Sequence, residues 1–390
     1  MTEWKECKIA DIGTVIGGAT PSTKDSANYE NGTIAWITPK DLSTFTGRYI
    51  KRGERNITEI GLKSCSTQLL PPNSVLFSSR APIGYIAIAA NEVCTNQGFK
   101  SVIPNDDTDP LFLYYLLKYN KDKIESMGSG TTFKEVSGNT MKGISVRVPQ
   151  DVSVQKRISA VLGMIDDKIE ENERINDNLE QQAKALYKDW FLDFSPFSSD
   201  GTLPEGWRIG TVGDIIQLHD SKRVPLSGTE RSKMAKLYPY YGATSLMDYV
   251  DNYLFDGIYL LLGEDGTVVD NLGFPILQYV YGRFWVNNHA HIITGKEGFS
   301  VEELYLFFGL TNIKSIVTGA VQQKVSQQNL KKVPAIIPSS TALSSFDELI
   351  QPIFSQIRNL RDENARLTSL RDTLLPKLMS GELDVSAVEF

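Results

Sequence analysis

IDDKIEENERINDNLEQQ, residues 165–182, has a charged or amide side chain at most of its positions, yet isoleucine or leucine returns at a regular interval. Ile158, Ile165 and Leu186 lie at multiples of seven residues from one another, and an apolar residue follows four positions after each. Alternating spacings of four and three form the a/d pattern of a coiled coil. The segment 151–194 is therefore predicted to be one long helix whose narrow apolar stripe needs a partner helix.

Two asparagines, Asn172 and Asn176, interrupt this stripe. A second segment, 341–390, repeats the spacing and carries Asn364 at the position equivalent to Asn176. Two such stripes can bury each other, and we expect an antiparallel pair with a pseudo-two-fold axis in which Asn172 faces Asn364. Polar residues in such a seam cost stability but fix the register, because a slip leaves an amide unpaired among apolar side chains.

The same register predicts that Ile165 faces Arg371. The alternative is two separate helices, each lying on its own globular unit. Pro352 and Pro376 interrupt the second segment, and we expect them to kink or break its helix because proline cannot donate an intrahelical hydrogen bond.

The chain also repeats its globular part once. GTTFKEVSGNTMKGISVRVP (130–149) aligns without a gap with GAVQQKVSQQNLKKVPAIIP (319–338). Short β-branched and aromatic runs alternate with Gly, Pro, Asn and Asp turns and one apolar helix in each half, which predicts mixed α and β structure. We therefore expect an α+β protein with two globular mixed α/β domains separated by two long helices that form an antiparallel coiled coil. The expected boundaries are 1–150, 151–194, 195–340 and 341–390.

The charge distribution, the hydropathy and the cysteine content of the chain indicate which classes of protein it can belong to. The 390 residues carry a formal net charge of −7, but the acidic excess falls in the two helical segments, so a nucleic-acid surface on the globular units is possible. The sequence has no apolar run long enough for a membrane span and no signal-peptide layout at its N-terminus. Its three cysteines are far apart, which favours a reduced, cytoplasmic protein without a cysteine metal site.

Common enzyme signatures are missing from the sequence. GTVIGG (13–18) is followed by Ala-Thr and lacks the lysine of a phosphate-binding loop, and no GxGxxG, HExxH or GxSxG occurs. No Asn/Asp-Pro-Pro-aromatic motif for gripping a target base is present. His289 and His291 are expected to share one face of a strand with Asn287, but no third ligand is visible, so we predict hydrogen-bonding roles and no metal.

Basic side chains near aromatic and amide groups are better candidates for a binding site. Lys and Arg in loops can neutralise phosphates, whereas Arg, Asn and Gln can recognise base edges. A solvated loop is the alternative for each residue. The candidates for DNA contact are Lys40, Arg48, Lys51, Arg52, Arg80, Asn96 and Gln97 in the first unit and Lys222, Arg223, Arg231, Lys233 and His289 in the second.

Several short motifs recur in order along both halves of the chain. They are GGATPST (17–23), IAWITPKDL (34–42), SSRAPIG (78–84), CTNQGFK (94–100), ALYKDWFLDF (185–194), LYPYYGATS (237–245), LLGEDGT (261–267), VNNHAHI (286–292) and LLPKLMSGEL (374–383). In this order they resemble the specificity subunit of a type I restriction–modification system, over essentially the whole chain. AVQQKV (320–325) departs from the pattern of its counterpart in the first half.

The resemblance implies two target-recognition domains that each recognise one half of a bipartite double-stranded DNA sequence, with helices that set the spacer. It also implies a non-catalytic chain that docks two adenine-N6 methyltransferase (modification) subunits, with restriction subunits in the full complex. S-adenosylmethionine, ATP and Mg would then bind the partner subunits, and this chain would bind no cofactor and no membrane. Two alternatives are a self-sufficient DNA methyltransferase or nuclease chain and a decoy paralogue without DNA binding.

Overall fold

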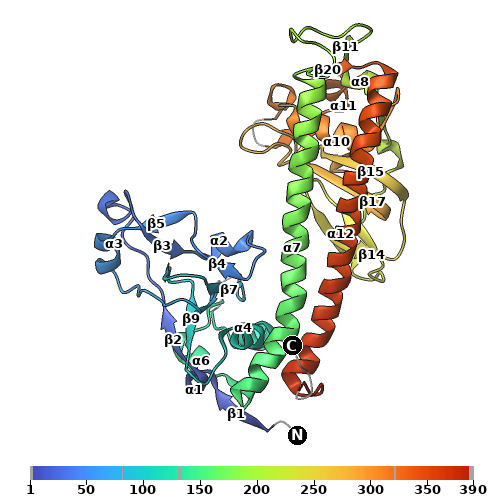
Figure 1. Ribbon diagram of the computed structural model, residues 1–390. Coiled ribbons are helices and arrows are strands. Elements are labelled where there is room, and N and C mark those ends of the chain that lie inside the picture. The colour runs from blue at the N-terminus through green and yellow to red at the C-terminus, as the bar shows by residue number, and fades with distance from the viewer. Residues whose placement is uncertain (1–2, 81, 131–133, 320–321, 386–390) are drawn as a thin grey trace. The chain divides into compact units, whose positions relative to one another are not determined.

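The computed structural model describes residues 3–80, 82–130, 134–319 and 322–385 (Figure 1). The chain divides into unit 1, Met1–Glu173 with Arg361–Phe390, and unit 2, Arg174–Leu360. The two long helices, α7 (Val152–Phe191) and α12 (Ser340–Ser380), each contribute one part to each unit. Within the described ranges, no helix is both long and apolar enough to cross a membrane.

Unit 1 contains a five-stranded sheet of order β2-β9-β6-β7-β4 and a three-stranded sheet of order β5-β3-β8. The apolar helix α4 packs on β6 and β7. A separate antiparallel pair, β1 with β10, joins the start of the chain to the strand that precedes α7. The bounds are β1 Trp4–Lys8, α1 Ile9–Ile12, β2 Gly13–Gly17, η1 Ser26–Asn28, β3 Ile34–Ile37, α2 Pro39–Ser43, β4 Tyr49–Ile50, β5 Arg55–Ile57, α3 Glu59–Lys63, β6 Val75–Phe77, β7 Ile86–Ala89, β8 Cys94–Thr95, β9 Lys100–Pro104, α4 Pro110–Tyr119, α5 Lys121–Ser126, α6 Gly138–Gly143 and β10 Ser145–Pro149.

Unit 2 contains a six-stranded sheet of order β12-β18-β15-β17-β13-β14 and a two-stranded sheet of β16 with β19. Helix α10 packs on β15, β17 and β18, and β11 pairs with β20 as β1 pairs with β10. The bounds are β11 Arg208–Thr211, α8 Val212–Ile215, β12 Ile216–Leu218, η2 Asp220–Lys222, α9 Gly228–Arg231, β13 Tyr238–Tyr241, β14 Leu246–Val250, β15 Phe255–Gly263, β16 Asp265–Gly266, β17 Leu277–Val286, β18 Ala290–Gly295, α10 Val301–Leu310, η3 Lys314–Ile316, β19 Gln323–Lys324, α11 Gln327–Leu330 and β20 Pro334–Ile337.

The repeat seen in the sequence is confirmed by local structure. Helix α6 begins where Ser137 Oγ accepts from the N–H of Thr140 at 3.0 Å, and α11 begins where Ser326 Oγ accepts from the N–H of Asn329 at 3.1 Å. Each serine satisfies one of the N–H groups that a helix start leaves unpaired. The order strand, short helix, sheet, apolar helix, short helix, strand recurs in both units, which confirms the α+β repeat.

Within unit 1, α7 and α12 pack antiparallel. Nδ2 of Asn172 donates to Oδ1 of Asn364 at 2.8 Å, as the antiparallel register predicts. The same register sets Ile165 opposite Arg371, and the long Arg371 side chain reaches the neighbouring carboxylate, with Nη1 donating to Oδ1 of Asp166 at 2.8 Å. Oδ2 of Asp166 also accepts from the Tyr115 hydroxyl at 2.5 Å.

Within unit 2, the two helices pack through aromatic rings. The Phe346 ring of α12 lies 5.7 Å from Tyr187 and 4.7 Å from Phe191, both on α7. Ala183, one turn earlier on α7, belongs to the same core as Ile350 and Phe354, later on α12. The alternative of two helices that each lie alone on a globular unit is therefore wrong.

The expected break in the second helix does not occur. Helix α12 is continuous from Ser340 to Ser380 and includes Pro352 and Pro376. Both prolines are exposed, and so are Glu348 and Asp372, the residues four positions before them whose carbonyls lose a hydrogen bond. Solvent can satisfy those carbonyls on an exposed helix face, which explains why the helix tolerates the two prolines.

Candidate nucleic-acid interface

In unit 1, backbone hydrogen bonds join three segments that are distant in sequence. The N–H of Ser79 donates to the carbonyl of Gly98 at 2.7 Å, and the N–H of Val136 donates to the carbonyl of Ser79 at 2.9 Å. Glu135 and Ser129 exchange two further bonds, at 2.8 and 3.0 Å. The segments meet beyond the carboxyl end of β6. We call residues 78–80, 95–98 and 134–136 together the three-segment frame of unit 1.

Unit 2 builds the same frame with the same hydrogen bonds. The N–H of Glu264 donates to the carbonyl of His289, and the N–H of Val325 donates to the carbonyl of Glu264, both at 2.8 Å. Lys324 and Thr318 exchange two bonds at 2.7 and 2.9 Å. The frame of unit 2 consists of residues 263–265, 286–289 and 322–325. By position in the two frames, Glu264 corresponds to Ser79, and Lys324 corresponds to Glu135.

The middle segment of the frame is an asparagine turn in both units. Oδ1 of Asn96 accepts from the N–H of Gly98 at 2.9 Å, and Oδ1 of Asn287 accepts from the N–H of His289 at 2.8 Å. Such side-chain bonds stabilise a turn. The residues at the tips, Gln97 and Asn288, are exposed. Asn96 therefore shapes the turn, and Gln97, whose Oε1 accepts from the Thr20 hydroxyl, is the amide that faces solvent.

His289 and His291 do not share a face, which corrects the sequence-based expectation. The segment 287–289 is a turn between β17 and β18, so the strand begins only at Ala290. His291 is fully buried, whereas the His289 side chain is 46% exposed. His289 Nδ1 lies 2.6 Å from Oδ1 of Asp265, which places this predicted contact residue on the frame itself.

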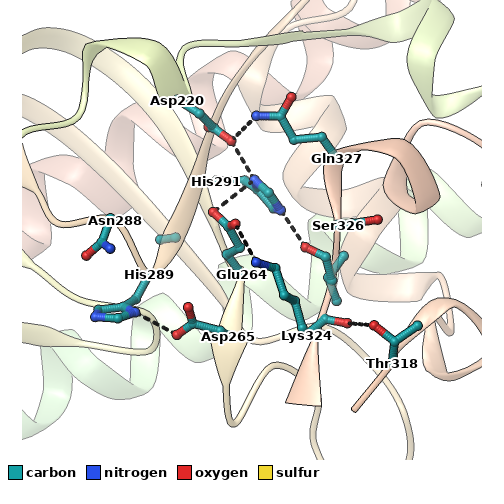
Figure 2. Close-up of polar contacts among 12 residues, drawn as sticks. Asp220, Glu264, Asp265, Asn288, His289, His291, Thr318, Lys324, Ser326 and Gln327 are labelled. Carbon is teal, nitrogen blue, oxygen red and sulfur yellow. Dashed lines mark hydrogen bonds and ion pairs between the residues drawn. The ribbon is translucent and has the colours of Figure 1, made fainter. Parts of the chain in front are cut away.

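His291 is the centre of a buried polar cluster with Asp220 and Glu264 (Figure 2). The ligand atoms of these three residues lie within 4.8 Å of one another, a spacing that a metal ion could use. However, His291 Nδ1 lies 2.6 Å from Asp220 Oδ2, and its Nε2 lies 2.8 Å from the carbonyl of Val325. Both ring nitrogens therefore already have an oxygen partner inside the fold, one from a carboxylate and one from a backbone carbonyl, and neither is open to a metal.

Cations already neutralise the carboxylates of this cluster. Arg223 Nη1 lies 2.6 Å from Glu264 Oε2, and Lys324 Nζ lies 3.6 Å from Glu264 Oε1. Burial raises the pKa of Asp220, but hydrogen bonds from His291 and from the N–H of Ile292 outweigh burial and hold that pKa below its usual value. The cluster therefore does not fit a metal site and serves to anchor the frame of unit 2.

Lys40, Lys51 and Arg52 form a second basic group in unit 1. They line one open hollow of about 520 Å³ between α2 and the segment that contains β4 and the residues after it. Lys40 pairs with Glu54 at 2.8 Å, whereas Lys51 and Arg52 are exposed and make no ion pair with any described residue. The structure thus brings these three predicted residues together and leaves Lys51 and Arg52 exposed.

Three of the predicted arginines are bound inside the fold. Arg48 is 5% exposed, with Nε 2.9 Å from Glu170 on α7 and Nη2 bonded to Asp167. Burial lowers the pKa of Arg48, but the hydrogen bonds to these two carboxylates raise it well above its ordinary value. The guanidinium thus fastens the β4 edge to α7, so its geometry does not support the predicted DNA contact.

Arg223 and Arg231 are held in the same way in unit 2. Arg223 bonds Glu264 and the carbonyl of Ala290, and Arg231 bonds Asp248 at 3.1 Å and lies 4.8 Å from the Tyr240 ring. Sequence patterns cannot separate such arginines from free ones, because the carboxylates that bind them are far away in the chain. The two exposed lysines, Lys222 and Lys233, make no ion pair within the described part of unit 2.

Sequence reasoning missed several polar residues of the frame. Asp265 begins β16, Gln323 and Lys324 form β19, and Gln322 and Gln323 line an open hollow of about 840 Å³. Ala320 and Val321 of the AVQQKV segment lie outside the described residues. The alignment of 130–149 with 319–338 is the signal that identifies these positions, since it places Lys324 opposite Glu135.

Comparison with known proteins agrees in both halves of the chain. A family model described as type I restriction modification DNA specificity domain matches residues 1–181 and 204–369. The type I restriction enzyme MjaIX specificity subunit of Methanocaldococcus jannaschii is 34% identical over 98% of this chain and 94% of that protein. The EcoprrI specificity subunit of Escherichia coli is 22% identical over 93% and 92%.

A solved structure shares the fold. The crystal structure of a type I restriction–modification system S subunit from M. genitalium superposes with a TM-score of 0.55 at 15% identity, and the alignment covers 97% of this chain and 96% of that one.

Proposed function

This chain belongs to the type I restriction–modification DNA specificity family, and from that premise we propose that each of its two units recognises one half of a bipartite double-stranded DNA target. The observation that carries the proposal is the three-segment frame. Both units hold the same backbone by the same hydrogen bonds but present different exposed side chains, Arg80 and Gln97 in one and Asn288, His289 and Lys324 in the other. Shared geometry with different polar groups suits two different half-sites.

In this proposal the exposed cations position the DNA and the frames select the bases. Lys51 and Arg52 of unit 1 and Lys222 and Lys233 of unit 2 would contact phosphates, which fix register on the duplex without selecting sequence. Polar side chains of the frames would enter the major groove, where each base pair presents a distinct pattern of donors and acceptors.

The two long helices complete the proposed function. We propose that α7 and α12 set the unread spacer between the half-sites and that their exposed acidic faces dock two methyltransferase subunits, with restriction subunits joining the full complex. S-adenosylmethionine would bind the methyltransferase subunits, and ATP with Mg the restriction subunits, so this chain would hold no cofactor of its own. Since both matched segments are DNA-specificity domains, a self-sufficient methyltransferase or nuclease is not supported.

The test is co-expression of the chain with the methyltransferase subunit of its own system in a host free of adenine methylation. Methylated adenines mapped across that genome should define one bipartite motif with two different half-sites and a fixed gap. The chain without the methyltransferase, and the methyltransferase without the chain, serve as controls. Methylation by this chain alone, or methylation by the pair without any sequence motif, would contradict the proposal.

A further inference from the structure

The two frames carry a basic and an acidic residue in opposite order at equivalent positions. In unit 1 a backbone bridge joins Arg80 to Glu135, and in unit 2 the equivalent bridge joins Asp265 to Lys324. In unit 1 the cation, Arg80, therefore lies on the first segment of the frame and the acid, Glu135, on the third. In unit 2 the acid, Asp265, lies on the first segment and the cation, Lys324, on the third.

Arg80 is held through its Nε atom, which leaves its two terminal nitrogens free of the other described residues. Its Nε lies 3.0 Å from Oε2 of Glu135, and its side chain is 47% exposed. No described residue provides another hydrogen-bond partner for this guanidinium. Glu135 also lies 3.5 Å from Lys100, which balances its charge and keeps the carboxylate in place. The two terminal nitrogens of Arg80 therefore form a preoriented fork, the geometry that matches O6 and N7 of guanine.

Asp265 presents the opposite chemistry at the equivalent place. Its Oδ1 lies 2.6 Å from Nδ1 of His289, and its side chain is 22% exposed. Lys324 lies 3.6 Å from Glu264, so the nearby cation is directed to the inner carboxylate. Oδ2 of Asp265 has no hydrogen-bond partner among the described residues. A carboxylate oxygen in this position can accept from an exocyclic amino group such as N4 of cytosine.

We propose that Arg80 and Asp265 are equivalent specificity-determining residues of opposite polarity, with Arg80 selecting a guanine in one half-site and Asp265 a cytosine in the other. Glu135 and His289 are positioning residues, since they orient the reading group through a hydrogen bond. This inference rests on the proposed function, because it assigns bases to frames that must first bind DNA.

The experiment maps methylated adenines with the assembled methyltransferase complex carrying each variant in turn. Arg80→Lys keeps the charge but loses the planar fork, so it should still methylate the original sites and accept other bases at one position of one half-site. Discrimination there should fall about tenfold or more, which is the typical effect of losing one bidentate base contact. Asp265→Ala should relax one position of the other half-site only.

A double exchange tests the reversal of polarity directly. Arg80→Asp with Glu135→Lys gives unit 1 the polarity of unit 2 and keeps the ion pair, so the frame should stay folded. The guanine preference should then be lost in that half-site while the other half-site stays unchanged. Arg52→Ala is the matched control, because it removes an exposed arginine of the same unit outside the frame and should lower methylation without changing the motif.

Two outcomes separate this inference from the proposed function. If Arg80→Lys and Asp265→Ala leave every position of a bipartite motif unchanged, the two residues do not select bases and the inference is wrong, although the proposed function stands. If the unmodified complex yields no bipartite motif, the proposed function itself fails. Relaxation of both half-sites by either variant would also overturn the assignment of one residue to each half.

Discussion

Replacing Glu303 by glutamine should change how the stability of unit 2 depends on pH. Glu303 is fully buried at the start of α10, and its Oε1 has no hydrogen-bond partner among the residues that the structure describes. Burial raises the pKa of Glu303 to about 8 from an ordinary value of 4.5, although Oε2 accepts from the N–H of Ser300 at 2.7 Å. The folded unit therefore favours the protonated, neutral carboxyl.

The sign and size of the effect follow from proton linkage. Because the folded-state pKa is the higher one, the folded state binds more protons between pH 4.5 and about 8. Stability is then fully present below pH 4.5 and is lost as pH rises towards 8. At about 1.36 kcal/mol per pH unit, the loss between about pH 5 and about pH 7.5 is roughly 3 kcal/mol. Glutamine cannot ionise, so Glu303→Gln should lack this slope.

The assay is thermal unfolding and amide hydrogen exchange of α10 in the full chain at several pH values. The stability difference between Glu303→Gln and the parent chain should grow steadily across this range, whatever its starting offset. The neighbouring Glu302 is the matched control. It pairs with Arg358 at 3.0 Å, so Glu302→Gln should destabilise by roughly 2–3 kcal/mol by leaving a half-buried cation unpaired. A stability difference for Glu303→Gln that is flat across pH would refute the reasoning.

Three further predictions concern the helix pair, the basic group and the frame. Asn172→Leu should lower the melting temperature by an amount equivalent to about 1 kcal/mol, because leaving Oδ1 of Asn364 without its donor in the seam costs more than the leucine gains by apolar burial. Arg52→Ala should reduce the magnitude of the log–log salt slope for DNA binding by the assembled complex by about 0.9, the contribution of one phosphate contact. Gly319→Ala should destabilise the frame by about 1 kcal/mol or more, because Gly319 has φ +90° and a Cβ there would lie 2.0 Å from the Gln322 carbonyl oxygen. Gly143→Ala is the control for the same melting measurement, because a Cβ at Gly143 meets no atom within 4 Å.

Periodicity and repetition were enough to predict the fold of this chain. The heptad spacing predicted the antiparallel pairing of Asn172 with Asn364, because a coiled-coil seam ties side-chain direction to sequence position. The expected break at Pro352 was wrong, because whether a proline breaks a helix depends on solvent access to the carbonyl four residues earlier. That access is a tertiary property. The ion pair of Arg371 with Asp166 was not predicted, because a long guanidinium can reach past the position opposite it to a neighbouring carboxylate.

The candidate site was predicted less completely than the fold. Residue type could not distinguish Arg48, bound to carboxylates of α7, from Arg52, which is exposed. The turn at Asn287 was mistaken for a strand, although two consecutive asparagines between two apolar runs are also a hairpin signal. The pairing of Arg80 with Glu135 joins residues far apart in sequence, which meet because backbone bonds of the folded unit tie residues 135 and 136 to residues 79 and 80.

The register of the helix pair links the stability of the chain to the spacer length that the helices are proposed to set. In unit 1 the Asn172–Asn364 bond and the Asp166–Arg371 ion pair lie one or two turns apart along the same seam. A slip of one heptad would break both at once and leave the 6%-exposed carboxylate of Asp166 without its cation, a cost of several kcal/mol. The same slip would shift one helix by about 10 Å along its axis, or roughly three base pairs of duplex. Polar groups that weaken an apolar seam are therefore suited to the proposed role of the helices, which is to set a spacer of fixed length.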